Sequence, residues 1–176
     1  MKDRKVIETK RDEYKQFFDE CFNNAMPGPN GDRAMAILGG AFLDERLYHL
    51  LDNFIVEDLS SKELIDKVLD FSARIDFSYS LGLIGAGMKK DLHHVRKIRN
   101  SFAHDLQGRS FSDDDIKSHC AALQAYDLGV KMFDDPRSRF ASTVTALASQ
   151  IHLNALGTKR REPAKDFTLG EFIRVP

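Results

Sequence analysis

The most regular pattern of apolar and polar positions runs from Lys89 to Leu106, in the segment KKDLHHVRKIRNSFAHDL. Apolar residues recur there three and four positions apart, which predicts an amphipathic helix with one stripe against a core. The stripe comprises Leu92, Val95, Phe102 and Leu106 with Arg99 in its middle, and a second face carries His93, Arg96, Asn100 and His104. Because an arginine in an apolar seam costs stability unless it is paired, this helix is the strongest pointer to function in the sequence.

Helical periodicity and helix-breaking residues divide the rest of the chain into further helices. The predicted helices are Asp3–Ala25, Arg33–Val56, Lys62–Leu69, Phe71–Ile84, Ser112–Phe133 and Arg139–Ala155. We expect Asp32 to cap the helix Arg33–Val56 and Ser60 or Ser61 to cap the helix Lys62–Leu69. Gly85 or Gly87 should end the helix Phe71–Ile84, and Asp134-Asp135-Pro136 should end the helix Ser112–Phe133. No segment shows a strand pattern. The sequence therefore predicts an all-α protein, a single helical bundle of about five to seven helices over residues 1–157. We expect residues 158–176 to form an extended tail that docks on the bundle or on a partner.

Charged residues within the apolar faces are expected to form structural ion pairs. The apolar stripe predicted for Arg33–Val56 comprises Ala34, Ile37, Leu38, Ala41, Tyr48 and Ile55, and Glu45 falls inside it. Glu45 either pairs with a cation, for which Arg99 and Arg74 are the candidates, or lies at the edge of the seam and reaches water. The segment Phe71–Ile84 is apolar on nearly every side, which predicts the central helix of the bundle, with Arg74 and Asp76 paired. The Gly39-Gly40 pair predicts a close helix approach or a kink.

Composition narrows the function classes. The chain has 176 residues, about one domain, and a formal net charge of −1, so any contact with nucleic acid needs a local basic patch. Its two cysteines, Cys21 and Cys120, lie far apart, which suits a reducing cytosol. There is no apolar leader or membrane-spanning run, and we expect a soluble cytoplasmic protein without a membrane partner. Neither a metal site nor a phosphate-binding glycine loop is evident, and we expect no cofactor.

Three segments together resemble the mannitol operon repressor family. They are RAMAILGGAFLDERLYHLL, FSARIDFSYSLGLI and DLHHVRKIRNSFAHDL, in this order between Arg33 and Leu106. The resemblance implies a small bacterial all-helical transcriptional regulator. No helix-turn-helix with an exposed polar recognition helix is visible, so direct sequence-specific DNA binding is not expected. A regulator that works as a homodimer through a protein partner fits the sequence better.

A second, local resemblance concerns Arg99-Asn100-Ser101-Phe102-Ala103-His104, which is similar to the R-x4-H motif of HEPN domains. That resemblance implies a metal-independent ribonuclease, a toxin or defence effector, with Arg99 and His104 as the catalytic pair and Asn100 orienting them. Histidine can move protons at neutral pH, and a guanidinium can stabilise charge on phosphorus. The residues expected to bind RNA phosphates are Lys89, Lys90, His93, Arg96 and Lys97.

Two alternatives to catalysis remain open for this motif. Residues five apart lie about 140° apart on a regular helix, so Arg99 and His104 converge only if the helix breaks or a second subunit completes the site. In the structural alternative, Arg99 pairs with a buried carboxylate and His104 caps the carboxyl end of its helix. In the other, the protein is a scaffold or antitoxin-like partner without chemistry, and the sequence alone leaves open whether it is an enzyme.

Overall fold

The structure is a computed structural model that describes residues 28–104, 108–124 and 134–166. Its helices are α2 (Pro29–Phe54), α3 (Leu59–Glu63), the π-helix η2 (Leu64–Val68), α4 (Phe71–Ser80), α5 (Ala86–His104), α6 (Asp114–Ala121) and α7 (Pro136–Gly157). These ranges contain no strand, which confirms the predicted all-α bundle. The predicted helix Asp3–Ala25, residues 105–107 with Leu106, residues 125–133 and the end of the tail lie outside the described residues. Within the described ranges, no helix is long and apolar enough to cross a membrane.

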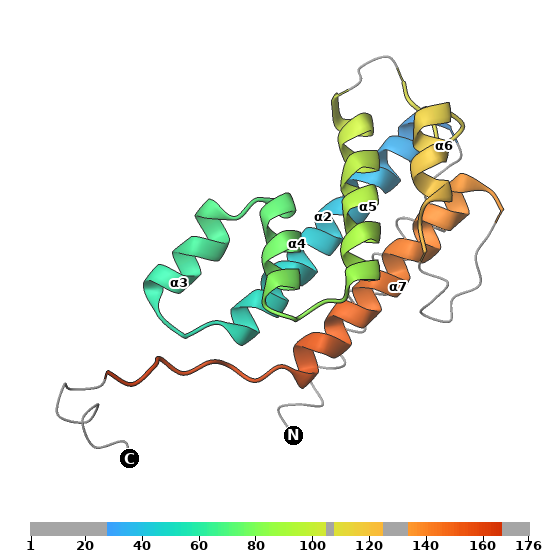
Figure 1. Ribbon diagram of the computed structural model, residues 1–176. Helices are drawn as coiled ribbons and strands as arrows, with labels where there is room; N and C mark the ends of the chain where they lie inside the picture. Colours follow the sequence, from blue (N-terminus) through green and yellow to red (C-terminus); the bar gives the residue numbers. More distant parts are fainter. Residues whose placement is uncertain (1–27, 105–107, 125–133, 167–176) are drawn as a thin grey trace, which may run out of the picture.

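The central helix is α2, and not the predicted Phe71–Ile84. It packs against α7, α5, α4 and η2, and in Figure 1 it crosses the middle of the molecule with α7 running beside it. The predicted central segment forms only α4, in which Ile75 and Ser78 are the buried residues. This helix ends early because Gly82 adopts a positive φ of 71° in the turn that follows, a conformation that favours glycine.

The buried face of α2 differs from the predicted stripe. Ala34 and Ala41 are exposed and Leu38 is 42% exposed. The buried residues are Asp32, Met35, Ala36, Gly39, Gly40, Phe42, Leu43, Arg46, Leu47, Leu50 and Leu51. This prediction was wrong because α2 carries apolar residues on almost every side, and periodicity alone does not select the side that meets its neighbours.

The Gly39-Gly40 pair permits close helix approach, the first of the two alternatives predicted for it. A Cβ at Gly39 would lie 3.1 Å from Phe140 Cε1 on α7, and a Cβ at Gly40 would lie 2.7 Å from Arg99 Cγ on α5. Adjacent glycines thus allow two different helices to approach α2. The second approach sets the position of Arg99.

The helix starts also differ from those predicted. Helix α2 begins at Pro29, so Asp32 lies inside its first turn, where it is buried. Its carboxylate accepts a hydrogen bond from Phe111 N at 3.1 Å and pairs with Arg137 Nε at 3.0 Å. Asp32 therefore ties the start of α2 to two distant segments, and it does not cap a helix.

Asp58 and Asp135 cap helices by accepting hydrogen bonds from backbone N–H groups. Asp58 caps α3 by accepting from Ser61 N at 2.8 Å, whereas Ser60 and Ser61 donate their hydroxyls to it. Asp135 caps α7 by accepting from Ser138 N at 2.9 Å, with Pro136 at the first helical position. The segment predicted only as a stop therefore starts the last helix, because aspartate followed by proline is a favourable helix start.

The extended segment after α7 returns to the carboxyl end of α2. Arg161 N donates to Phe54 O at 2.7 Å, and its guanidinium lies 5.0 Å from the centre of the Phe54 ring. Arg160 donates to Ile55 O at 3.4 Å. These contacts satisfy carbonyls at a helix end and place positive charge there.

Candidate functional site

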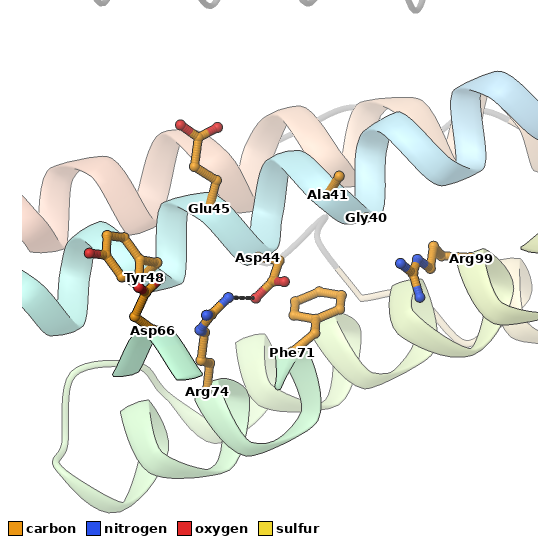
Figure 2. A pocket seen from close by; sticks show the side chains of 9 residues that line it. All are labelled: Gly40, Ala41, Asp44, Glu45, Tyr48, Asp66, Phe71, Arg74 and Arg99. Carbon is orange, nitrogen blue, oxygen red and sulfur yellow. Dashed lines mark hydrogen bonds and ion pairs between the residues drawn. The ribbon is translucent and has the colours of Figure 1, made fainter. Parts of the chain in front are cut away.

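A pocket lies between α2, the η2–α4 segment and α5, and we call it the Arg99 pocket. It has two adjoining lobes. The tyrosine lobe, about 320 Å³, is lined by Gly40, Ala41, Asp44, Glu45, Tyr48, Asp66, Phe71, Arg74 and Arg99 (Figure 2). The arginine lobe, about 440 Å³, is lined by Asp44, Asp66, Lys67, Val68, Leu69, Asp70, Phe71, Ser72, Arg74, Arg96, Arg99 and Asn100. These volumes suit a small molecule or a protruding side chain.

The Asp44–Arg74 ion pair forms the wall shared by the two lobes. Arg74 Nη1 lies 2.6 Å from Asp44 Oδ1, the contact dashed in Figure 2. Arg74 also donates from Nε and Nη2 to Ile65 O, at 3.2 and 2.8 Å. Its side chain is 13% exposed, so one guanidinium ties α2 to η2 from a largely dry position. This wall is held in place by the protein itself.

Arg99 lies where the two lobes meet. Its Nη1 donates to Asn100 Oδ1 at 3.0 Å, its side chain is half-buried, and its aliphatic stem rests on Gly40. Within the described ranges it forms no ion pair with a carboxylate, and Figure 2 shows its guanidinium near Phe71 in the pocket. Ile98, and not Arg99, completes the buried stripe of α5, so Arg99 belongs to the edge of the seam.

Arg96 contributes a second guanidinium, to the arginine lobe alone. It lies three residues before Arg99 and four before Asn100, so the three side chains share one face of α5. Its Nε is buried and has no hydrogen-bond partner among the described residues. A buried donor without a partner carries a desolvation cost, which an acceptor in the lobe would relieve.

His104 is not part of this pocket. It is exposed at the last residue of α5 and lines neither lobe in the part of the chain that the structure describes. The pocket therefore brings together Arg99 and Asn100 of the predicted catalytic set but leaves His104 outside. A catalytic role for the three remains a prediction.

The predicted phosphate-binding residues divide into three groups. Lys89 and His93 contact Asp76 Oδ1, at 2.8 and 3.2 Å, and the Lys89 hydrogen bond, followed by that of His93, keeps the pKa of Asp76 below its ordinary value. Arg96 lines the pocket, whereas Lys90 and Lys97 are exposed. Binding of RNA phosphates by these five residues of α5 stays a prediction.

The residues predicted to form structural ion pairs all have partners, though not always the expected ones. Asp76 pairs with Lys89, and Arg74 pairs with Asp44. Glu45 is 56% exposed and lies 3.5 Å from His49 Nε2 and 3.7 Å from Arg46 Nη2. Glu45 therefore lies at the edge of the seam and reaches water, which was one of the two alternatives for this residue.

Asp44 lines both lobes and is a pocket residue that the sequence pattern does not single out. It lies four residues after Gly40, so it shares the face of α2 that approaches α5. That spacing was the available signal. The pairing of Asp44 is not visible in the local pattern, because its partner Arg74 lies 30 residues further along the chain.

The described residues offer no obvious metal centre. No group of three or more histidine, cysteine, aspartate or glutamate side chains suited to a metal occurs among the described residues. One pair of histidines meets between α5 and α6, where the Nδ1 atoms of His94 and His119 are 3.2 Å apart. Burial, followed by the charges of His119, Lys97 and His93, lowers the pKa of His94.

Comparison with known proteins defines the fold class. No family model matches the chain. No curated protein matches it either. Among solved structures, the chain is similar to a chain in the X-ray structure of the MtlR–HPr complex from Escherichia coli, with a TM-score of 0.59 and 21% sequence identity. The match covers 78% of this chain and 97% of that one. The protein therefore has an MtlR-like fold, as the resemblance to mannitol operon repressors implies, whereas the comparisons do not support the HEPN resemblance.

Proposed function

We propose that this protein is a bacterial transcriptional regulator that acts in the cytoplasm by binding a partner protein. The observation that carries the proposal is its fold, which it shares with a chain in the complex of MtlR with the protein HPr. HPr is accordingly the first partner that we propose. Regulation through a protein contact also agrees with the lack of a recognisable DNA-reading helix in the sequence.

The partner surface that we propose lies on α3 and η2. Three large apolar side chains are exposed within ten residues, Leu59 at 83%, Leu64 at 39% and Val68 at 68%, and we call this set the α3–η2 surface. These short helices project from the side of the bundle in Figure 1, and Ile65 is their buried residue. Exposed apolar clusters mark interaction sites, and π-helices often occur at functional sites. Val68 also lines the arginine lobe, so a partner on this surface would border the Arg99 pocket.

Light scattering coupled to size-exclusion chromatography tests the proposal. We also propose that the protein is a homodimer, and because the chain has a mass of 20.0 kDa, the mass of the purified protein distinguishes a monomer from a dimer. After mixing with Escherichia coli HPr, we expect a single peak whose mass equals the sum of the two proteins. Separate elution of the two proteins at every mixing ratio would contradict the proposal.

A metal-independent ribonuclease is the second candidate function. The observation that favours it is the Arg99 guanidinium, which has no carboxylate partner among the described residues and is bonded to Asn100. The test is RNA cleavage without added metal by wild type, Arg99→Met and His104→Ala, each accompanied by a thermal melt. Cleavage by wild type that folded His104→Ala lacks would support it. Intact RNA after incubation with folded wild type would exclude it.

A further inference from the structure

We infer that the arginine lobe of the Arg99 pocket is a binding site for a small phosphate-type oxyanion, such as inorganic phosphate or a phosphate monoester. The ligand would be held by Arg96, Arg99 and Asn100 of α5. This inference does not depend on the partner protein proposed above.

Two guanidinium groups face this lobe without a carboxylate to neutralise them. Among the described residues, neither Arg96 nor Arg99 forms an ion pair, and the Arg96 Nε is buried without an acceptor. Guanidinium groups carry several donors in a planar fork that matches the oxygens of phosphate. Because the two arginines lie three residues apart on one helix face, both can reach the same anion.

Asn100 adds a neutral donor to the same face. Its Oδ1 accepts from Arg99 Nη1 at 3.0 Å, which fixes the orientation of the amide and leaves its NH₂ group to donate. The contact also holds the Arg99 guanidinium in place beside the lobe. A site whose donors are already oriented loses less entropy when the ligand binds.

The carboxylates around the lobe are already engaged or lie in solvent. Asp44 is paired with Arg74, and Asp70 caps α4 by accepting from Ala73 N at 2.8 Å. Asp66 is exposed. Lys67 and Ser72 also line the lobe. The charges near Arg96 and Arg99 therefore favour the binding of an anion, although the whole chain has a net charge of −1.

Isothermal titration of the full chain with inorganic phosphate tests the inference, with sodium chloride at matched ionic strength as the reference. We expect saturable binding to wild type. Arg96→Gln and Arg99→Met should each weaken it about tenfold or more, because each loses a charge-assisted hydrogen bond. Methionine preserves the aliphatic stem that packs on Gly40. If Arg99→Met fails to fold, Arg96→Gln alone tests the inference.

The matched control is Lys117→Gln, which removes one positive charge from the exposed face of α6, away from the pocket. It should bind phosphate as wild type does. The inference is overturned if wild type shows no saturable binding, or if all variants bind equally, as a general salt effect would produce. Binding of a single-stranded RNA oligonucleotide without any binding of phosphate would overturn it too and would favour a nucleic-acid site.

Discussion

The side chain of Arg99 on α5 packs directly over Gly40 on α2. A Cβ at Gly40 would lie 2.7 Å from Arg99 Cγ and 3.0 Å from Arg99 Cβ, both closer than carbon atoms pack. The missing side chain at Gly40 therefore lets the arginine stem lie against α2, with its guanidinium in the pocket. This contact couples the packing of the two helices to the geometry of the candidate site.

Gly40→Ala should therefore destabilise the protein, although alanine favours a helix. Overpacking costs about 1–3 kcal/mol, whereas the gain in helix propensity is about 1 kcal/mol. We therefore expect the free energy of unfolding, measured with urea, to fall by about 1 kcal/mol. In an Arg99→Ala background Gly40→Ala should destabilise the protein less, because the new Cβ no longer meets the Cγ of Arg99. Gly87→Ala is the matched control, since nothing lies within 4 Å of its added Cβ, and it should stabilise α5 by about 0.5–1 kcal/mol. An equal cost of Gly40→Ala in both backgrounds would refute the contact.

Replacing Asp44 by asparagine should lower the free energy of unfolding by about 1–3 kcal/mol. The reason is that Arg74, which is 13% exposed, would lose the charge that balances it in a dry position. The control is Glu63→Gln, which breaks the exposed Lys67–Glu63 pair and should change stability by less than about 0.5 kcal/mol. Similar effects of the two substitutions in thermal melts would show that the Asp44–Arg74 pair is no more than a surface contact.

Asp32 and Asp58 should differ in their importance for stability. Asp58→Ala removes a helix cap and should cost about 1 kcal/mol. Asp32→Ala leaves the buried Phe111 N without its acceptor and removes the buried carboxylate that pairs with Arg137, and it should cost about 3 kcal/mol. Chemical unfolding of both variants measures the difference. Equal costs would restore the interpretation of Asp32 as a simple cap.

Stability should fall as the pH drops below about 6.5, the ordinary pKa of histidine, in part because of His94. Burial, followed by nearby positive charge, lowers the pKa of His94 in the folded protein, so the unfolded chain binds more protons in this range. The stability that neutral His94 provides is present above its unfolded pKa and is lost as the pH falls toward its folded pKa. Melting temperatures between neutral pH and about pH 5.5 should therefore decrease less steeply for His94→Gln than for wild type. Parallel slopes would contradict the prediction.

The sequence alone predicts the buried face of some helices and not of others. The buried stripe of α5 was predicted at Leu92, Val95 and Phe102, because this helix is amphipathic and has one charged side. The prediction of Arg99 at the centre of the stripe is wrong, because Ile98, one residue earlier, occupies that buried position. For α2 the sequence predicted the helix but not its buried face, since a helix surrounded by neighbours has no single polar side.

The candidate site was predictable only in its α5 half. Arg96 and Asn100 are predictable because polar residues at four-residue spacing share a helix face, and Arg99 because it is a charged residue in an apolar stripe. Asp44 and its pairing with Arg74 depend on how α2 and α4 meet, which no local pattern encodes. The position of His104 relative to the pocket likewise depends on the tertiary structure.

The most direct test of the central claim, that this protein works by holding a partner protein, is isothermal titration calorimetry with HPr. We predict saturable binding to wild type, weakened about tenfold or more by the combined Leu59→Ser and Val68→Ser substitutions in the α3–η2 surface. The matched control combines Leu153→Ser and Leu156→Ser, which change exposed leucines on α7, and should leave the affinity unchanged. Absence of any binding between folded wild-type protein and HPr would contradict the claim.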